Sequence, residues 1–147
     1  MLKNIITDRV VSVAPETKVS EVARKMAEEN VGAVLVCEDK KPRGILTDRD
    51  IVIRCISKEI DVDDCTVEQI LTEPVECVQD TDGIFDCIRK MSDMGVRRIP
   101  VVNSNGEVVG LVSFGDLIMV LGRELSTLAE AVTSGGGMEK ENLLKVA

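Results

Sequence analysis

The chain has 147 residues, which is enough for one domain with a proper hydrophobic core. Its formal net charge of −8 and its two aromatic residues, both phenylalanine, argue against nucleic-acid binding. Such a protein repels a phosphate backbone and has almost no side chain on which a base can stack. The sequence also contains no histidine, which removes histidine-based acid–base catalysis, Ser–His and Cys–His nucleophile pairs and most zinc sites. We therefore expect no catalytic residue and no metal site.

Five cysteines occur without any Cys-x-x-Cys pair, and their neighbours are mostly apolar. This pattern predicts buried free thiols in a reducing cytoplasm, with a redox or metal role as the alternative. No leader pattern and no unbroken apolar run of about 18 residues is present, so we expect a cytoplasmic protein without a membrane-bound segment.

The first half of the chain predicts the order strand, helix, strand, strand, helix. A short strand at 10–13 is followed by a helix that begins at Thr17 as its cap and continues to about Glu29. A hairpin with strands at 31–36 and 44–46 comes next, and a second helix is expected to start near Asp48.

The second half predicts the same order, with Asp82 as the cap of its first helix. Its hairpin turns through Asn105-Gly106, a strong hairpin signal, and its last helix is expected from Phe114 towards Val132. The glycine run after Ser134 should end that helix. A further short amphipathic helix is predicted over 138–147.

The two halves are copies of one another at a spacing of about 65 residues. The segment GILTDRDI, residues 44–51, matches GLVSFGDL, residues 110–117, with a spacing of 66 after one extra residue in the second hairpin. A repeat of this kind predicts one pseudo-symmetric domain with ligand sites at the seam. We expect repeat 1 over 1–60, repeat 2 over 61–125 and a tail of unknown role over 126–147.

Each copy keeps a hydroxyl residue three positions before an aspartate, Thr47/Asp50 and Ser113/Asp116. An ionised carboxylate at a helix start accepts two hydrogen bonds at once, which suits the two neighbouring hydroxyls of a ribose. The hydroxyl residue and the free amides of the helix can face a phosphate. The alternative is ordinary helix capping, for which the same residue types are preferred.

On these motifs the chain resembles a tandem pair of cystathionine-β-synthase-type (CBS) domains, also called a Bateman module, over roughly residues 4–125. The resemblance implies an α/β (α+β) fold of two pseudo-symmetric β-α-β-β-α repeats that form one CBS pair. It also implies that the paired signatures hold the ribose and phosphate of an adenosyl ligand. AMP, ADP or ATP would be the regulatory ligand, with NAD or S-adenosylmethionine as further possibilities, and no cofactor would be required.

Basic residues of the family reach the nucleotide phosphates from the position of Arg97 and Arg98 in the segment GVRRIPVV. The first copy has Gly32 and Ala33 there, so its site departs from the family pattern. A surface arginine pair on an acidic protein is the alternative. The resemblance further implies apolar slots for adenine, for which a role in the core is an equal alternative: Val10, Val11, Val31, Val75 and Val96.

We therefore predict a non-catalytic adenosyl sensor that acts as a homodimer, since CBS pairs join as disc-like dimers through their helices. The sensor would regulate a separate protein partner in trans. The cleft of Ser113 and Asp116, with the two arginines in its own copy, is expected to bind phosphorylated ligands more tightly than the cleft of Thr47 and Asp50. The alternative is a constitutive oligomerisation or interaction module with vestigial clefts. An enzyme is poorly supported, because neither aspartate has a catalytic partner.

Overall fold

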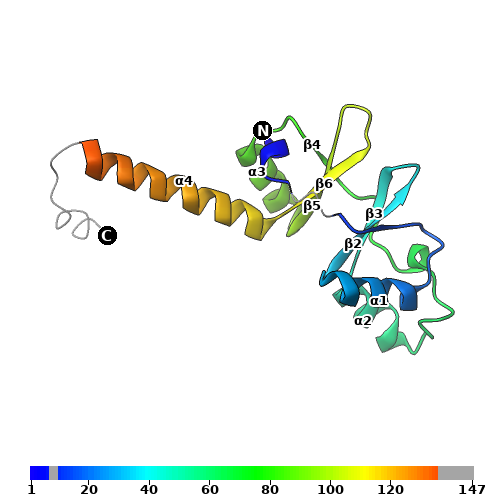
Figure 1. Cartoon of the computed structure of the whole chain (residues 1–147). Helices are drawn as coiled ribbons and strands as arrows, with labels where there is room; N and C mark the ends of the chain where they lie inside the picture. The colour runs from blue at the N-terminus through cyan, green and yellow to red at the C-terminus, as the bar shows by residue number, and fades with distance from the viewer. Residues whose placement is uncertain (7–9, 136–147) are drawn as a thin grey trace.

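The computed structural model describes residues 1–6 and 10–135, which fold into two similar halves joined side by side, with one long helix projecting from them (Figure 1). The predicted helix at 138–147 lies outside the described residues. No helix in the described part of the chain is both long and apolar enough to cross a membrane.

The first half contains a three-stranded sheet in the order β1-β2-β3 and two helices. Its elements are β1 (Ser12–Val13), α1 (Val19–Glu29), β2 (Ala33–Glu38), β3 (Lys41–Thr47) and α2 (Asp48–Arg54). Strand β1 pairs with β2 in parallel, whereas β2 and β3 form an antiparallel hairpin.

The second half repeats this arrangement in the order β4-β5-β6, again with one parallel and one antiparallel pair. Its elements are β4 (Val78–Gln79), α3 (Ile84–Met94), β5 (Arg98–Val102), β6 (Val108–Ser113) and α4 (Phe114–Gly135). The α/β fold of two pseudo-symmetric β-α-β-β-α repeats is thus confirmed.

The first helix of each half ends as predicted but begins differently. Asn30 and Gly95 adopt the left-handed conformation directly after α1 and α3. The prediction that Thr17 caps α1 was wrong. The N-cap is Lys18, one residue later, and the first amides of α1 donate hydrogen bonds to distant backbone carbonyls. The amide of Val19 donates to the carbonyl of Cys65 and that of Ser20 to the carbonyl of Val62.

Asp82 was also wrong as a helix cap. Gly83 occupies the N-cap position of α3, and the Asp82 carboxylate instead accepts a hydrogen bond from the amide of Gln79 at 2.9 Å. Its side chain therefore closes the turn after β4 rather than the start of the helix.

The core of each half is completed by the segment that leads into the other half. Leu2, in a 3₁₀ turn at Leu2–Asn4, is fully buried in the core of the second half. The first core receives four residues of the segment that follows α2, which includes a 3₁₀ turn at Val67–Gln69: Cys65, Val67, Ile70 and Leu71. Packing therefore crosses the predicted division at residue 60, and that boundary stays a prediction.

All five cysteines are free thiols, of which Cys55, Cys65 and Cys87 are buried. Burial raises the pKa of the Cys87 thiol, and the neighbouring Asp82 raises it further. Burial also raises the pKa of Cys65, as does a hydrogen bond with Cys55. The folded state therefore favours the neutral thiols.

We expect the protein to lose stability at alkaline pH. Thiols of the unfolded chain ionise near their ordinary pKa of about 8.5, before the buried ones do. Their contribution to stability is therefore complete below that pH and is lost as pH rises past it. Urea unfolding at a series of pH values measures this loss, which should become shallower in Cys87→Ala. A free energy of unfolding that stays flat well above pH 9 contradicts the expectation.

Candidate functional site

The two hydroxyl–aspartate signatures adopt the same local structure, each at the junction of a strand and the following helix. Ser113 Oγ donates to Asp116 Oδ2 at 2.6 Å, and the Ser113 amide donates to the same oxygen at 2.8 Å. Thr47 Oγ1 and its amide contact Asp50 Oδ2 at 2.8 and 2.9 Å. In each copy the aspartate amide bonds back to the hydroxyl at 3.2 Å. Helix capping is thus part of the role of both pairs.

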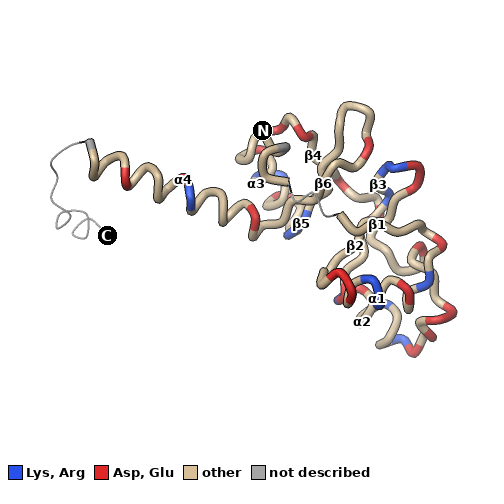
Figure 2. The backbone as a smooth tube through the Cα atoms, viewed as in Figure 1, with Lys and Arg blue, Asp and Glu red and all other residues tan. Residues whose placement is uncertain are grey.

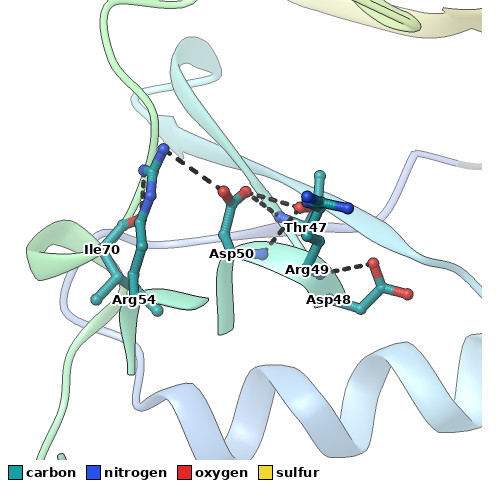
Figure 3. A network of polar contacts seen from close by, with 6 residues as sticks. All are labelled: Thr47, Asp48, Arg49, Asp50, Arg54 and Ile70. Carbon is teal, nitrogen blue, oxygen red and sulfur yellow. Dashed lines mark hydrogen bonds and ion pairs between the residues drawn. The ribbon is translucent and has the colours of Figure 1, made fainter. Parts of the chain in front are cut away.

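The second carboxylate oxygen differs between the copies. Asp50 Oδ1 lies 3.6 Å from the guanidinium of Arg54, one turn further along α2 (Figure 3). Arg54 is itself fixed by a 2.9 Å hydrogen bond to the carbonyl of Ile70. The Asp50 carboxylate is therefore occupied on both oxygens within its own chain.

Asp116 has no such neighbour, because the residue one turn further along α4 is Val120. Within residues 1–6 and 10–135, Asp116 Oδ1 has no hydrogen-bond or ion-pair partner. This half-buried oxygen keeps its full capacity to accept hydrogen bonds from a ligand.

Asp116 lies in a cleft of about 410 Å³ at the seam between the halves. This volume falls within the usual range for small-molecule sites, roughly 300–1,000 Å³. One wall comes from the first half and the other from the second. The lining residues are Val10, Val11, Asn30, Val31, Gly32, Ala33, Arg98, Leu111, Ser113 and Asp116.

The cleft therefore joins the apolar residues predicted in the first copy to the polar signature of the second. Gly32 lines the cleft, and its carbonyl accepts a hydrogen bond from the amide of Asp48 at 3.2 Å. A Cβ atom at this position would lie 3.3 Å from Asp48 Oδ2. Glycine at position 32 therefore avoids a close contact with the Asp48 carboxylate.

The two predicted arginines separate in the structure. Arg98 begins β5 and lines the cleft together with Ser113 and Asp116. Arg97 lines a different hollow, of about 330 Å³, beside Phe114. Neither guanidinium takes part in any ion pair within the described part of the chain.

The remaining predicted residues do not line this cleft. Val96 lines the hollow that contains Arg97, and half-buried Val75 precedes β4 with its carbonyl near the Cys77 thiol. Sequence reasoning did not assign Asn30 or Leu111 to the site. Leu111 lies two residues before Ser113 on β6, so the period of two along a strand places both on one face. No group of acidic and sulfur ligands suited to a metal ion occurs among the described residues.

This fold and cleft define a class of two-repeat α/β proteins with a ligand-sized cleft at the seam between the repeats. The CBS domain family matches the chain twice, over residues 2–56 and 67–123, so the chain belongs to this family.

Relatives and solved structures share the arrangement. The CBS domain-containing protein YhcV of Bacillus subtilis is 32% identical over 79% of this chain and 81% of its own length. An uncharacterized protein of Methanopyrus kandleri is 32% identical over 82% of this chain, which spans 62% of that relative's length. A CBS domain protein of Pyrobaculum aerophilum, solved in complex with AMP, is 30% identical. Its TM-score is 0.75, with 86% of this chain and 98% of that chain covered.

Proposed function

We propose that this protein is a non-catalytic regulatory module that binds an adenine nucleotide in the cleft of Ser113 and Asp116. The observation that carries the proposal is the Asp116 carboxylate, which has one oxygen fixed by the helix cap and the other without a partner among the described residues. An acceptor held in place and left unpaired is suited to the two hydroxyls of a ribose.

The rest of the cleft supplies the two other kinds of contact that a nucleotide needs. Arg98 is a cation without an ion-pair partner in the described chain, on the wall of this cleft in a protein of net charge −8, and it suits a phosphate. Val10 and Val31 supply apolar surface for a base. AMP is the ligand of choice for a first test, since a 30% identical relative is complexed with it.

We further propose that the module acts as a homodimer. Ile51 and Leu117 are buried under the sheets, whereas the opposite sides of α2 and α4 expose other large apolar residues. These include Val52 and Ile53 on α2, Ile56 just after it, and Ile118, Met119 and Leu125 on α4. An apolar surface of this extent favours a protein contact. A nucleotide would shift the dimer between arrangements by its difference in affinity for them.

We expect AMP to bind, and Arg98→Gln to weaken that binding by about tenfold. The reason is that one charge-assisted hydrogen bond contributes about 1.5–3 kcal/mol, the low end of which is tenfold in Kd. Isothermal titration calorimetry measures both constants. Arg97→Gln is the matched control, since its side chain lies in a separate hollow, and its Kd should stay within about twofold of the unaltered protein.

A thermal-shift screen extends the test to ADP, ATP, NAD and S-adenosylmethionine. A ligand at 100 times its Kd should stabilise the fold by about 2.7 kcal/mol. No response to any of the five at millimolar concentration contradicts nucleotide binding and favours a constitutive interaction module. The Asp50 carboxylate, which is already paired with Arg54, is consistent with a vestigial cleft at Thr47 and Asp50 but not at Ser113 and Asp116.

A further inference from the structure

Helix α4 carries a continuous apolar stripe that extends well past the end of the second repeat. Its members follow one another in alternating steps of four and three residues, which is the a/d pattern of a coiled-coil heptad. They are Phe114, Ile118, Leu121, Leu125, Leu128 and Val132. In heptad notation Ile118, Leu125 and Val132 occupy a positions, and the other three occupy d positions.

Three of the four charged residues of the helix lie on the opposite side from this stripe, and the fourth, Glu124, is at a g position that flanks it. Asp116, Arg123 and Glu130 recur every seven residues, at the f positions furthest from the apolar stripe. Figure 2 shows how sparse charge is along the rest of the helix. The e positions, which flank the stripe, include the small residues Gly122 and Ala129, which permit close approach of another helix.

Residues 1–6 and 10–135 leave most of this stripe uncovered. Figure 1 shows α4 projecting away from the two halves, with no other helix or strand beside its later turns. Leu125 is 66% exposed, Leu128 is 63% exposed and Val132 is 52% exposed. A Cβ atom placed on Gly122 would meet no atom within 4 Å in the described structure.

We propose that α4 forms a parallel two-stranded coiled coil with α4 of a second copy of this chain. β-branched residues at a and leucine at d favour parallel dimers. Ile118 and Val132 at a positions and Leu121 and Leu128 at d positions follow this rule. The inference deepens the homodimer proposed above and rests on it.

The size of the contact points to a second copy rather than to an unrelated helix. With 22 residues, α4 is about 33 Å long, and a strip one helix wide covers roughly 700 Å² on the two chains together. A stable interface needs about 1,200 Å² or more. The exposed apolar residues of α2, Val52 and Ile53, lie outside this strip and belong to the surface proposed above for the homodimer. A second copy of this chain brings both surfaces into one twofold contact, which a single unrelated helix does not do.

The first test disrupts the packing of the proposed coiled coil. Leu125→Asp should raise the dimer Kd at least tenfold in sedimentation velocity, since it places a charge at an a position. Ser126→Asp, at the neighbouring outer position, is the matched control and should leave the dimer intact. Because both side chains are exposed in the chain, the thermal unfolding of each variant should show a folded domain. A Leu125→Asp variant that dimerises as tightly as the control overturns the coiled coil.

The second test fixes the orientation. In a parallel coil the two copies of residue 128 face each other, so Leu128→Cys should form an intermolecular disulfide under mild oxidation. The unaltered protein and Ser126→Cys are the controls for the native thiols and for the outer face. An antiparallel pairing with the two stripes fully overlapped would place residue 128 beside residue 118 of the other copy. The two copies of residue 128 would then lie about 15 Å apart along the helix axis, too far for a disulfide. A dimer without the cross-link overturns the parallel arrangement. A monomer that still binds AMP overturns the coil and leaves the nucleotide site standing.

Discussion

Asp116→Ala is expected to abolish detectable AMP binding, whereas Asp50→Ala should leave it nearly unchanged. The two aspartates make the same capping contacts, so their structural roles are matched. They differ in the second carboxylate oxygen, which is taken by Arg54 in the first copy and has no partner among the described residues in the second.

The expected size of the effect follows from the bonds at stake. Two charge-assisted hydrogen bonds to a ribose, at about 1.5–3 kcal/mol each, correspond to a loss of at least a hundredfold in affinity. Loss of either cap should cost about 1 kcal/mol of stability in both variants. Thermal unfolding therefore serves as the control that both variants remain folded to a similar degree.

Calorimetric titration of AMP into the two variants separates the outcomes. Loss of binding in Asp50→Ala with retention in Asp116→Ala means that the nucleotide occupies a cleft built on the first copy. Equal, small effects in both variants mean that the signatures serve as helix caps alone. Only a large loss confined to Asp116→Ala supports the proposed site.

The sequence predicted the repeated architecture well because its signals are local. A few neighbouring residues determine each of them: the strands that begin with a glycine and apolar residues, the hairpin turns, and the left-handed helix ends at Asn30 and Gly95. The start of α1 was mispredicted for the opposite reason, whereas at α3 two local roles competed for Asp82 and the turn after β4 took its carboxylate. The first amides of α1 bond to carbonyls more than 40 positions away, a pairing that no local pattern encodes.

In the candidate site, too, the features set by local sequence were predicted and those set by long-range packing were not. The signature pairs were found from their spacing, and the structure places one of them in a cleft. The separation of Arg97 from Arg98 reflects the start of β5, since Arg97 lies in the bend before the strand and Arg98 is its first residue. The contact between Arg54 and Asp50 spans one helical turn and could have been anticipated from the sequence. The joining of Val31 to Ser113 across the seam could not, because it depends on how the two halves pack.

Gly44→Ala is expected to destabilise the fold by about 1–3 kcal/mol or more, the usual cost of overpacking a close contact. Gly44 is buried on β3 where the chain passes closely on its way into the second half. A Cβ atom there would lie 1.8 Å from Leu71 Cδ1 and 2.9 Å from the carbonyl oxygen of Thr72. Leu71 can change its rotamer, but the Thr72 carbonyl is held by a hydrogen bond from the amide of Ile45.

The other glycines provide a graded comparison. Gly110 is the equivalent position in the second copy, where the atoms nearest to a Cβ would belong to the side chain of Ile6, the first at 2.4 Å. Because a side chain yields more easily than backbone, Gly110→Ala should cost less than Gly44→Ala. Gly122→Ala places its methyl group in open space on α4 and should raise stability by up to about 1 kcal/mol, the helix preference of alanine over glycine.

Urea unfolding of the three variants measures this order directly, and each kcal/mol lost should lower the melting temperature by about 3 °C. The contact of Gly44 with Leu71 and Thr72 belongs to the seam that joins the halves, so the loss should appear in one cooperative transition. If Gly44→Ala proves as stable as Gly122→Ala, the connecting segment is not packed against β3 as closely as described, and the cleft it helps to position must be reconsidered with it.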